Sequence, residues 1–176
     1  DIEDYIKNTL KSGREWESQH VEYLKEFAKP GSTVVDVGAH IGTITIPASR
    51  IVGDSGRVIS FEPQPKIFRE LNHNLMLNKI RNVSTFRYAV GDAPGEIELK
   101  TFVPGNEGGT SLDHARTNGE KAQVVTLDSM ALNNVSVIKI DVEGWEDKVL
   151  HGAKETILRN KPVILIEIQG GYDYDD

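Results

Sequence analysis

The chain has 176 residues, which is enough for one domain with a full hydrophobic core but not comfortably for two. It has no cysteine, which excludes disulfides, thiolate metal sites and cysteine nucleophiles, and its formal charge of −7 disfavours nonspecific binding to nucleic acid. Because no apolar run is long enough to span a membrane and no signal peptide opens the chain, we expect a single cytoplasmic domain over residues 1–176 without a nucleic-acid partner.

Residues 1–29 are predicted to be helical, because apolar residues recur at helical spacing until Pro30-Gly31 ends the pattern. From there, short apolar strands alternate with helices. Strands are expected at Thr33–Val37, Arg57–Phe61, Val83–Val90, Ser136–Asp141 and Val163–Ile168. Helices are expected at Pro65–Asn78 and around residues 145–157, and a helix after the first strand would contain Pro47. This alternation predicts a Rossmann-like α/β fold, with a mostly parallel sheet and helices on both faces.

The region 91–128 interrupts the alternation. Glu96–Phe102 alternates apolar and polar residues, residues 104–109 are rich in turn formers, and Ala122–Thr126 could be a returning strand. We therefore expect an inserted β-hairpin near residues 95–126. Surface insertions of this kind often shape a substrate pocket.

The stretch VVDVGAHIGTIT, residues 34–45, joins the first strand to a glycine-containing loop. In an open parallel sheet, ligands bind at the carboxyl ends of the strands, and Gly38 and Gly42 would let the backbone turn sharply there. The dinucleotide fingerprint needs a middle glycine that this loop lacks, and the Gly-Lys-Ser/Thr of a phosphate-binding Walker loop is absent too. The loop is therefore poorly suited to a pyrophosphate.

Acidic residues lie at or just after the ends of the first three strands. Asp36 precedes the first glycine, Glu62 ends the second strand, where a ribose commonly binds, and Asp92 follows the third in AVGD. Carboxylates near the ligand suit a cation with hydroxyls and an amine better than a polyphosphate. S-adenosylmethionine is such a ligand, since it carries a sulfonium, an ammonium and a ribose. The structural alternatives to ligand binding are a turn at GDAPG and a capping role for the acids.

Five segments together resemble the FkbM family of S-adenosylmethionine-dependent methyltransferases: VVDVGAHIGTIT, VISFEPQP, AVGD, TLDSM and VIKIDVEGWEDKVLHGA. The resemblance runs from about residue 31 to 168, and KIDVEGWE is its most family-specific part. It implies a class I methyltransferase fold with a cofactor-binding core over residues 31–168. It also implies S-adenosylmethionine as the cofactor and O-methylation of a hydroxyl on a sugar, glycan or natural product.

The resemblance further implies which residues form the site. Those expected at the methionine and sulfonium end of the cofactor are Asp36, Gly38, Ala39, His40 and Gly42. Those expected at the ribose and adenine are Glu62, Pro63, Val90 and Asp92. Asp141, Glu143 and Gly144 would close the site after the fourth strand.

The reaction needs an acceptor oxygen aligned with the methyl–sulfur bond and a group that takes up its proton. The resemblance makes Asp141 or Glu143 the candidate base and His40 a weaker one. In an alternative, Asp141, Glu143 and Glu167 surround a divalent metal that lowers the pKa of the acceptor hydroxyl. The sequence does not decide between these, and no residue is assigned as a metal ligand.

The C-terminus departs from the family pattern. Such a sheet usually ends with an antiparallel pair of strands, and this pair is not apparent in the eight residues after Ile168. Either the chain is cut before this pair or the pair is missing, and in the second case the fifth strand would be an apolar edge open to a second copy or a partner. One alternative function is therefore a non-catalytic cofactor-binding module completed by a partner. A nicotinamide-dependent oxidoreductase, suggested by Glu62 after a βαβ unit, is disfavoured by the missing glycine.

Overall fold

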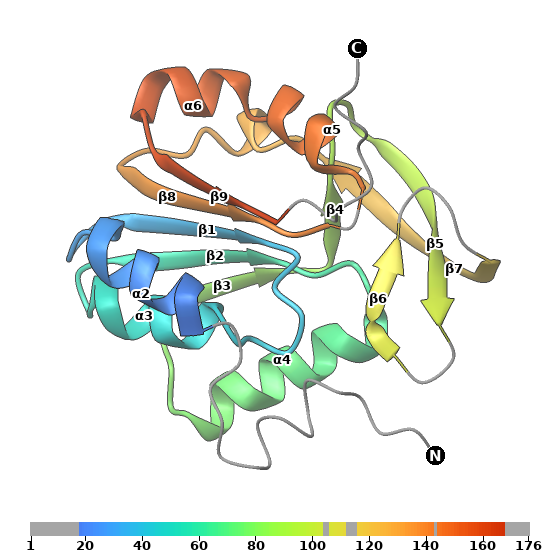
Figure 1. The fold of residues 1–176 in the computed structure, drawn as a ribbon, viewed down its shortest axis with the longest axis horizontal. Coiled ribbons are helices and arrows are strands. Elements are labelled where there is room, and N and C mark those ends of the chain that lie inside the picture. The colour runs from blue at the N-terminus through green and yellow to red at the C-terminus, as the bar shows by residue number, and fades with distance from the viewer. Residues whose placement is uncertain (1–17, 104–105, 112–115, 143, 168–176) are drawn as a thin grey trace.

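A computed structural model describes residues 18–103, 106–111, 116–142 and 144–167. Its centre is a five-stranded parallel sheet in the order β3-β2-β1-β8-β9 (Figure 1). The strands are β1 (Thr33–Val37), β2 (Arg57–Phe61), β3 (Val83–Phe86), β8 (Val135–Ile140) and β9 (Val163–Ile166). Helices α2 (Ser18–Phe27), α3 (Thr45–Val52) and α4 (Pro65–Leu77) lie on one side of the sheet. Helices α5 (Glu146–His151) and α6 (Lys154–Asn160) lie on the other, which confirms the predicted Rossmann-like fold.

β1 explains how a charged side chain comes to lie in the interior. All five of its residues are buried, as expected for a central strand covered on both faces. Val34 packs in the cluster formed with α2 and α3, whereas Val35 and Val37 pack in the cluster under α5 and α6. Because successive side chains of a strand alternate between faces, Asp36 shares the α3 face with Val34.

The strand order reverses between β1 and β8. From β1 the chain proceeds outward to β2 and β3, and it later returns on the other side of β1 to form β8 and β9. The loops that follow β1 and β8 therefore leave the sheet in opposite directions, and ligands of open α/β sheets bind at such a point. The expected ligand site thus lies at the carboxyl ends of β1 and β8.

The predicted strand Val83–Val90 is wrong, because it is two strands in different sheets. Val83–Phe86 is β3 and pairs with β2, whereas Tyr88–Val90 is β4 and pairs with β7. The apolar pattern continues across Arg87, so periodicity alone does not reveal the change of pairing partner.

The insertion is larger than the predicted hairpin. β5 (Gly95–Val103) and β7 (Arg116–Val125) form the expected antiparallel pair, but β6 (Asn106–Ser111) lies where a loop over residues 104–109 was expected. Its residues, NEGGTS, are poor strand formers, and pairing with β5 is what makes them extended. The second sheet has the order β4-β7-β5-β6 and stands beside the carboxyl ends of the first sheet's strands (Figure 1).

The helices differ from prediction in detail. α4 begins at Pro65 as expected, with Pro65 in the first turn. The single helix expected around residues 145–157 is wrong: α5 and α6 are separate helices that meet at Gly152 and Ala153. Pro47 is the third residue of α3, where its missing N–H costs no intrahelical bond, so it introduces no kink. Of the predicted N-terminal helical segment 1–29, residues 1–17 lie outside the described residues, and α2 forms in the rest.

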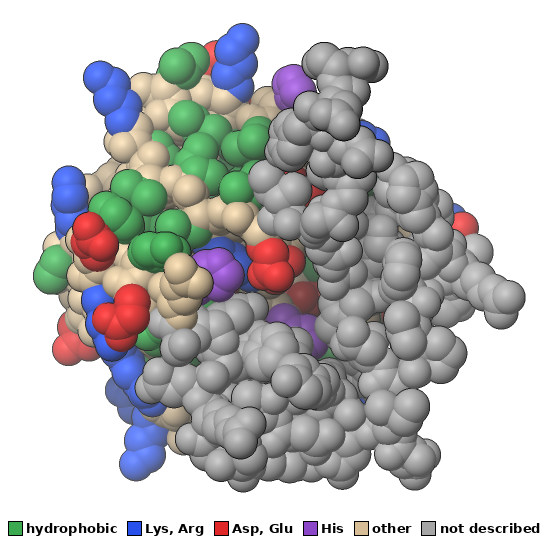
Figure 2. All heavy atoms as spheres, viewed as in Figure 1, with side chains coloured by type: hydrophobic (Ala, Val, Ile, Leu, Met, Phe, Trp, Pro, Cys, Tyr) green, Lys and Arg blue, Asp and Glu red, His purple; other side chains and the backbone are tan. Residues whose placement is uncertain are grey.

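β9 lies at the edge of the first sheet in the described part of the chain. Its four side chains are only half-buried, and Leu158 of the neighbouring α6 is 61% exposed. In the view of Figure 2, apolar side chains gather on the left half of the molecule, over α6 and β9. Pairing of a second copy along this edge stays a prediction, and the absence of closing strands concerns residues beyond Glu167, outside the described ranges. No helix within those ranges is long and apolar enough to cross a bilayer.

Candidate functional site

The loop after β1 turns onto the end of β2 and touches the end of β8. The backbone N–H groups of Gly38 and Ala39 both donate to the carbonyl oxygen of Phe61, at 3.0 and 2.9 Å. Gly38 has φ +81°, and a Cβ atom there would lie 1.8 Å from the carbonyl oxygen of Asp141. Only glycine fits this position, because the left-handed backbone and the contact both exclude a side chain. The sequence prediction of a sharp turn at Gly38 is confirmed.

The loop takes left-handed conformations at two further positions. Gly42 has φ +97°, and its missing side chain leaves room for Leu71 of α4. His40 has φ +48°, a conformation that glycine adopts most easily. Ala39 is buried against Leu71 and Leu75, so it packs in the core. The loop is therefore held in one shape by its own backbone and by α4.

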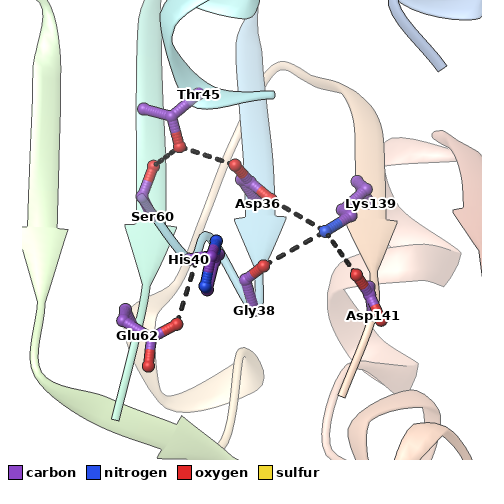
Figure 3. Close-up of polar contacts among 8 residues, drawn as sticks. All are labelled: Asp36, Gly38, His40, Thr45, Ser60, Glu62, Lys139 and Asp141. Atoms are coloured by element: carbon purple, nitrogen blue, oxygen red, sulfur yellow. Dashed lines mark hydrogen bonds and ion pairs between the residues drawn. The ribbon is translucent and has the colours of Figure 1, made fainter. Parts of the chain in front are cut away.

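Asp36 is fully buried under this loop. Its Oδ2 atom accepts a 2.6 Å hydrogen bond from the hydroxyl of Thr45, and that hydroxyl lies 2.9 Å from the hydroxyl of Ser60 (Figure 3). Burial raises the pKa of the Asp36 carboxyl above its ordinary value, against the opposing effects of Lys139 and the Thr45 hydrogen bond. The structure thus places Asp36 inside the protein, with its oxygens directed at protein groups.

Lys139 is a residue of the candidate site that the sequence prediction missed. It lies on β8 directly beside Asp36 of β1 and is 3% exposed. Its ammonium donates to the carbonyl oxygen of Gly38 at 3.1 Å and to Asp141 Oδ2 at 3.3 Å, and lies 3.7 Å from Asp36 Oδ1 (Figure 3). The signal that could have found it is a lone lysine within the apolar strand VSVIKI, two residues before Asp141 and hence on its face.

Glu62 follows β2 and is 4% exposed. Its Oε2 atom accepts the backbone N–H of His40 at 3.0 Å, and its Oε1 atom accepts that of Gln64 at 2.9 Å. Burial raises the pKa of this carboxyl from 4.5 to about 7, although the two backbone N–H groups favour the charged form. Glu62 thereby joins the loop after β1 to the loop after β2.

The remaining predicted residues lie in different places. Asp141 belongs with the cluster of Figure 3, and its side chain is 27% exposed. Val90 and Asp92 lie instead on and after β4, where Val90 is buried and Asp92 is exposed. Pro63 is half-buried beside Glu62, and Glu143 lies outside the described residues. The structure thus brings Asp36, Gly38, His40, Glu62 and Asp141 together.

The position of Asp92 depends on the segment after β8. A Cβ atom on Gly152 would lie 1.9 Å from the carbonyl oxygen of Gly91 and 3.3 Å from the Cα atom of Asp92.

Trp145 packs between the main core and the second sheet, and the Lys148 ammonium lies 3.4 Å from the centroid of the Trp145 ring. These contacts make Trp145 a residue that packs the main core against the second sheet.

Glu146 is a second residue that the prediction missed. It is buried at the start of α5, and both carboxylate oxygens lie 3.0 Å from the backbone nitrogen of Gly144, which donates to them. It therefore fixes the loop that connects Asp141 to α5. Within the described ranges, no three His, Asp or Glu side chains are arranged to hold a metal ion. The metal alternative includes Glu143 and stays a prediction.

Comparison with known proteins gives one family and several relatives. The model of the Methyltransferase FkbM domain matches residues 36–176. The hexuronic acid methyltransferase AglP of Haloferax volcanii is 27% identical over 91% of this chain and 65% of its own length. Methyltransferase 1 of Beauveria bassiana is 26% identical over 80% of this chain and 67% of its own length.

Among solved structures, a methyltransferase FkbM from Methylobacillus flagellatus is similar in fold. The similarity covers 83% of this chain and 39% of that chain, with 20% identity and a TM-score of 0.58. The chain thus spans about two fifths of that structure and about two thirds of the Haloferax relative.

Proposed function

The chain belongs to the FkbM methyltransferase family, and we propose that it transfers a methyl group from S-adenosylmethionine to a hydroxyl of a sugar, glycan or natural product. The single observation that carries the proposal is the cluster of Figure 3 at the reversal of strand order. Similarity to a hexuronic acid methyltransferase supports a sugar as the acceptor.

The charge of the cluster suits the cofactor. Asp36, Glu62 and Asp141 contribute carboxylates, and Lys139 is the cation among the residues drawn in Figure 3. An excess of carboxylates favours a ligand with a sulfonium and an ammonium and disfavours a polyphosphate. The missing side chain at Gly38 keeps the β1 loop close to β8.

Glu62 is suited to the ribose. Each of its oxygens accepts one backbone N–H, and a carboxylate oxygen can accept a second hydrogen bond. Two neighbouring hydroxyls of a ribose can therefore donate to a carboxylate that the loops already hold in place. We propose that this contact selects the ribose, with Pro63 beside it and Asp92 and Val90 toward the adenine.

S-adenosylmethionine, when bound, supplies a methyl group that its sulfonium has already activated. The chain must then orient the acceptor oxygen and take up its proton. Asp141 is the candidate for the proton, because its carboxylate is partly exposed and the Lys139 ammonium holds its Oδ2 atom. His40 and Glu143 are the alternatives.

The test of the cofactor is calorimetric titration with S-adenosylhomocysteine, with NADH and ATP as controls. Ligand at a hundred times its dissociation constant should also stabilise the fold by ~2.7 kcal/mol, which a melting curve detects. Binding of S-adenosylhomocysteine alone is the expected result. Binding of NADH instead would overturn the proposal in favour of an oxidoreductase.

The test of catalysis uses methyl-labelled S-adenosylmethionine with hexuronic acids and neutral hexoses as acceptors. Asp141→Asn should abolish label transfer, whereas Asp147→Asn, which removes the same charge from an exposed position on α5, should not. If Asp141→Asn keeps its turnover, the proton goes elsewhere and Glu143→Gln and His40→Gln become the next variants. Cofactor binding without transfer to any acceptor would favour a non-catalytic module.

A further inference from the structure

Lys139 joins three segments of the chain at one point. The oxygens around its ammonium come from the loop after β1 (Gly38), from β1 itself (Asp36) and from the end of β8 (Asp141). All three lie within 3.7 Å, and the lysine is 3% exposed. Two hydrogen bonds, to Gly38 and Asp141, and an ion pair with Asp36 therefore hold the ammonium in the described part of the chain.

Stability alone does not explain a lysine at this position. Val137, which lies on the same face of β8, is fully buried among apolar residues, so this face of the strand accepts an apolar side chain. Removing a charge from water costs several kcal/mol, and replacing buried ion pairs by apolar residues is often neutral or stabilising. A buried lysine that contacts three predicted site residues therefore points to a role in the site.

We propose that Lys139 is a positioning residue that fixes the Asp141 carboxylate and the Gly38 carbonyl in the arrangement that binds the cofactor. Asp36 is its buried counter-ion and does not contact the cofactor. Its Oδ2 atom is bound by Thr45, its Oδ1 atom faces Lys139, and it has no exposed surface. The inference rests on the proposed function, because the arrangement matters only if this site binds S-adenosylmethionine.

A double-variant cycle separates this role from a structural one. Lys139→Met leaves Asp36 buried without its counter-ion, so it should lower both the melting temperature and the affinity for S-adenosylhomocysteine. Adding Asp36→Asn removes the stranded carboxylate and should restore most of the melting temperature. It does not restore the contacts to Asp141 and Gly38, so the affinity of Asp36→Asn/Lys139→Met should stay at least tenfold below that of Asp36→Asn.

The experiment measures urea unfolding and S-adenosylhomocysteine titration for the wild type, Asp36→Asn, Lys139→Met and the double variant. Lys121→Met, an exposed lysine of β7, controls for the lost charge. If Lys139→Met does not fold, the comparison of the double variant with Asp36→Asn still shows whether Lys139 contributes to cofactor affinity.

The two possible failures are distinct. If affinity returns together with stability in the double variant, Lys139 is only a structural ion-pair partner and the inference is wrong. If the wild type itself binds no S-adenosylhomocysteine, the proposed function is wrong and the positioning role is wrong with it.

Discussion

Gly38 and Asp141 are in direct backbone contact, since a Cβ atom on Gly38 would lie 1.8 Å from the Asp141 carbonyl oxygen. There is therefore no room for even one methyl group between the loop after β1 and the end of β8. This contact makes the two halves of the sheet share one site, and it makes the site sensitive to the smallest substitution.

Gly38→Ala should destabilise the fold and weaken cofactor binding. The left-handed backbone alone costs an alanine roughly 1–2 kcal/mol, and the contact with Asp141 adds to that. Gly144→Ala separates the two contributions, because Gly144 has φ +95° but its Cβ atom would meet nothing within 4 Å. Urea unfolding should show the larger loss for Gly38→Ala. Equal losses would mean that the loop moves aside freely.

Gly152→Ala should act on the other end of the site. The new Cβ atom would lie 1.9 Å from the carbonyl oxygen of Gly91, so the loop that carries Asp92 must shift. We expect weaker binding of S-adenosylhomocysteine, with a smaller loss for analogues that lack the adenine. Gly95→Ala, where the Cβ atom enters open space, is the matched control. An unchanged affinity in Gly152→Ala would remove Asp92 from the site.

The sequence predicts the first two strands to the residue. Thr33–Val37 and Arg57–Phe61 are short apolar runs with glycine or proline near their ends, so local pattern and tertiary pairing agree. β6 shows the opposite case. Its sequence favours a turn, and only pairing with β5 makes it a strand.

The site could be predicted in part for the same reason. Asp36 lies one residue before the end of β1, and Gly38, Glu62 and Asp141 directly follow β1, β2 and β8, so topology alone brings them together. Lys139 lies inside a strand and becomes a site residue only through register, which pairs it with Asp36. Glu146 acts through its own neighbouring backbone, and its position in the first turn of α5 gave only a weak signal.

Glu62 should make stability depend on pH. Its pKa is raised to about 7 in the folded protein by burial, against 4.5 for the ordinary group. Between these values the folded state keeps a proton that the unfolded chain loses, so the free energy of unfolding falls as the pH rises. A shift of this size corresponds to roughly 3 kcal/mol. Glu62→Gln should flatten this part of the pH profile in urea unfolding, whereas Glu98→Gln at an exposed position should not.

The same carboxyl should make cofactor affinity depend on pH with the opposite sign. A ribose donates to the ionised carboxylate, so affinity for S-adenosylhomocysteine should increase as the pH rises through about 7. Glu62→Gln should bind more weakly and without this dependence. Glu62→Ala is a less specific variant, because it also leaves the buried N–H groups of His40 and Gln64 without their acceptor. A wild-type affinity that does not change between pH 6 and 8, as titration would show, contradicts the ribose contact.

Thr45 should stabilise the fold through its hydroxyl. This group donates to Asp36 Oδ2 at 2.6 Å and lies 2.9 Å from the Ser60 hydroxyl, all three side chains being buried. Thr45→Val keeps the shape and removes the donor, so it should cost about 1–3 kcal/mol of unfolding free energy, the penalty for an unsatisfied buried acceptor. Thr45→Ser keeps the hydroxyl and should cost less, since it loses only a methyl group. In an Asp36→Asn background the penalty of Thr45→Val should shrink, because the buried carboxylate that needed the donor is gone. Equal losses for Val and Ser would show that the methyl group, and not the hydrogen bond to Asp36, is what this position contributes.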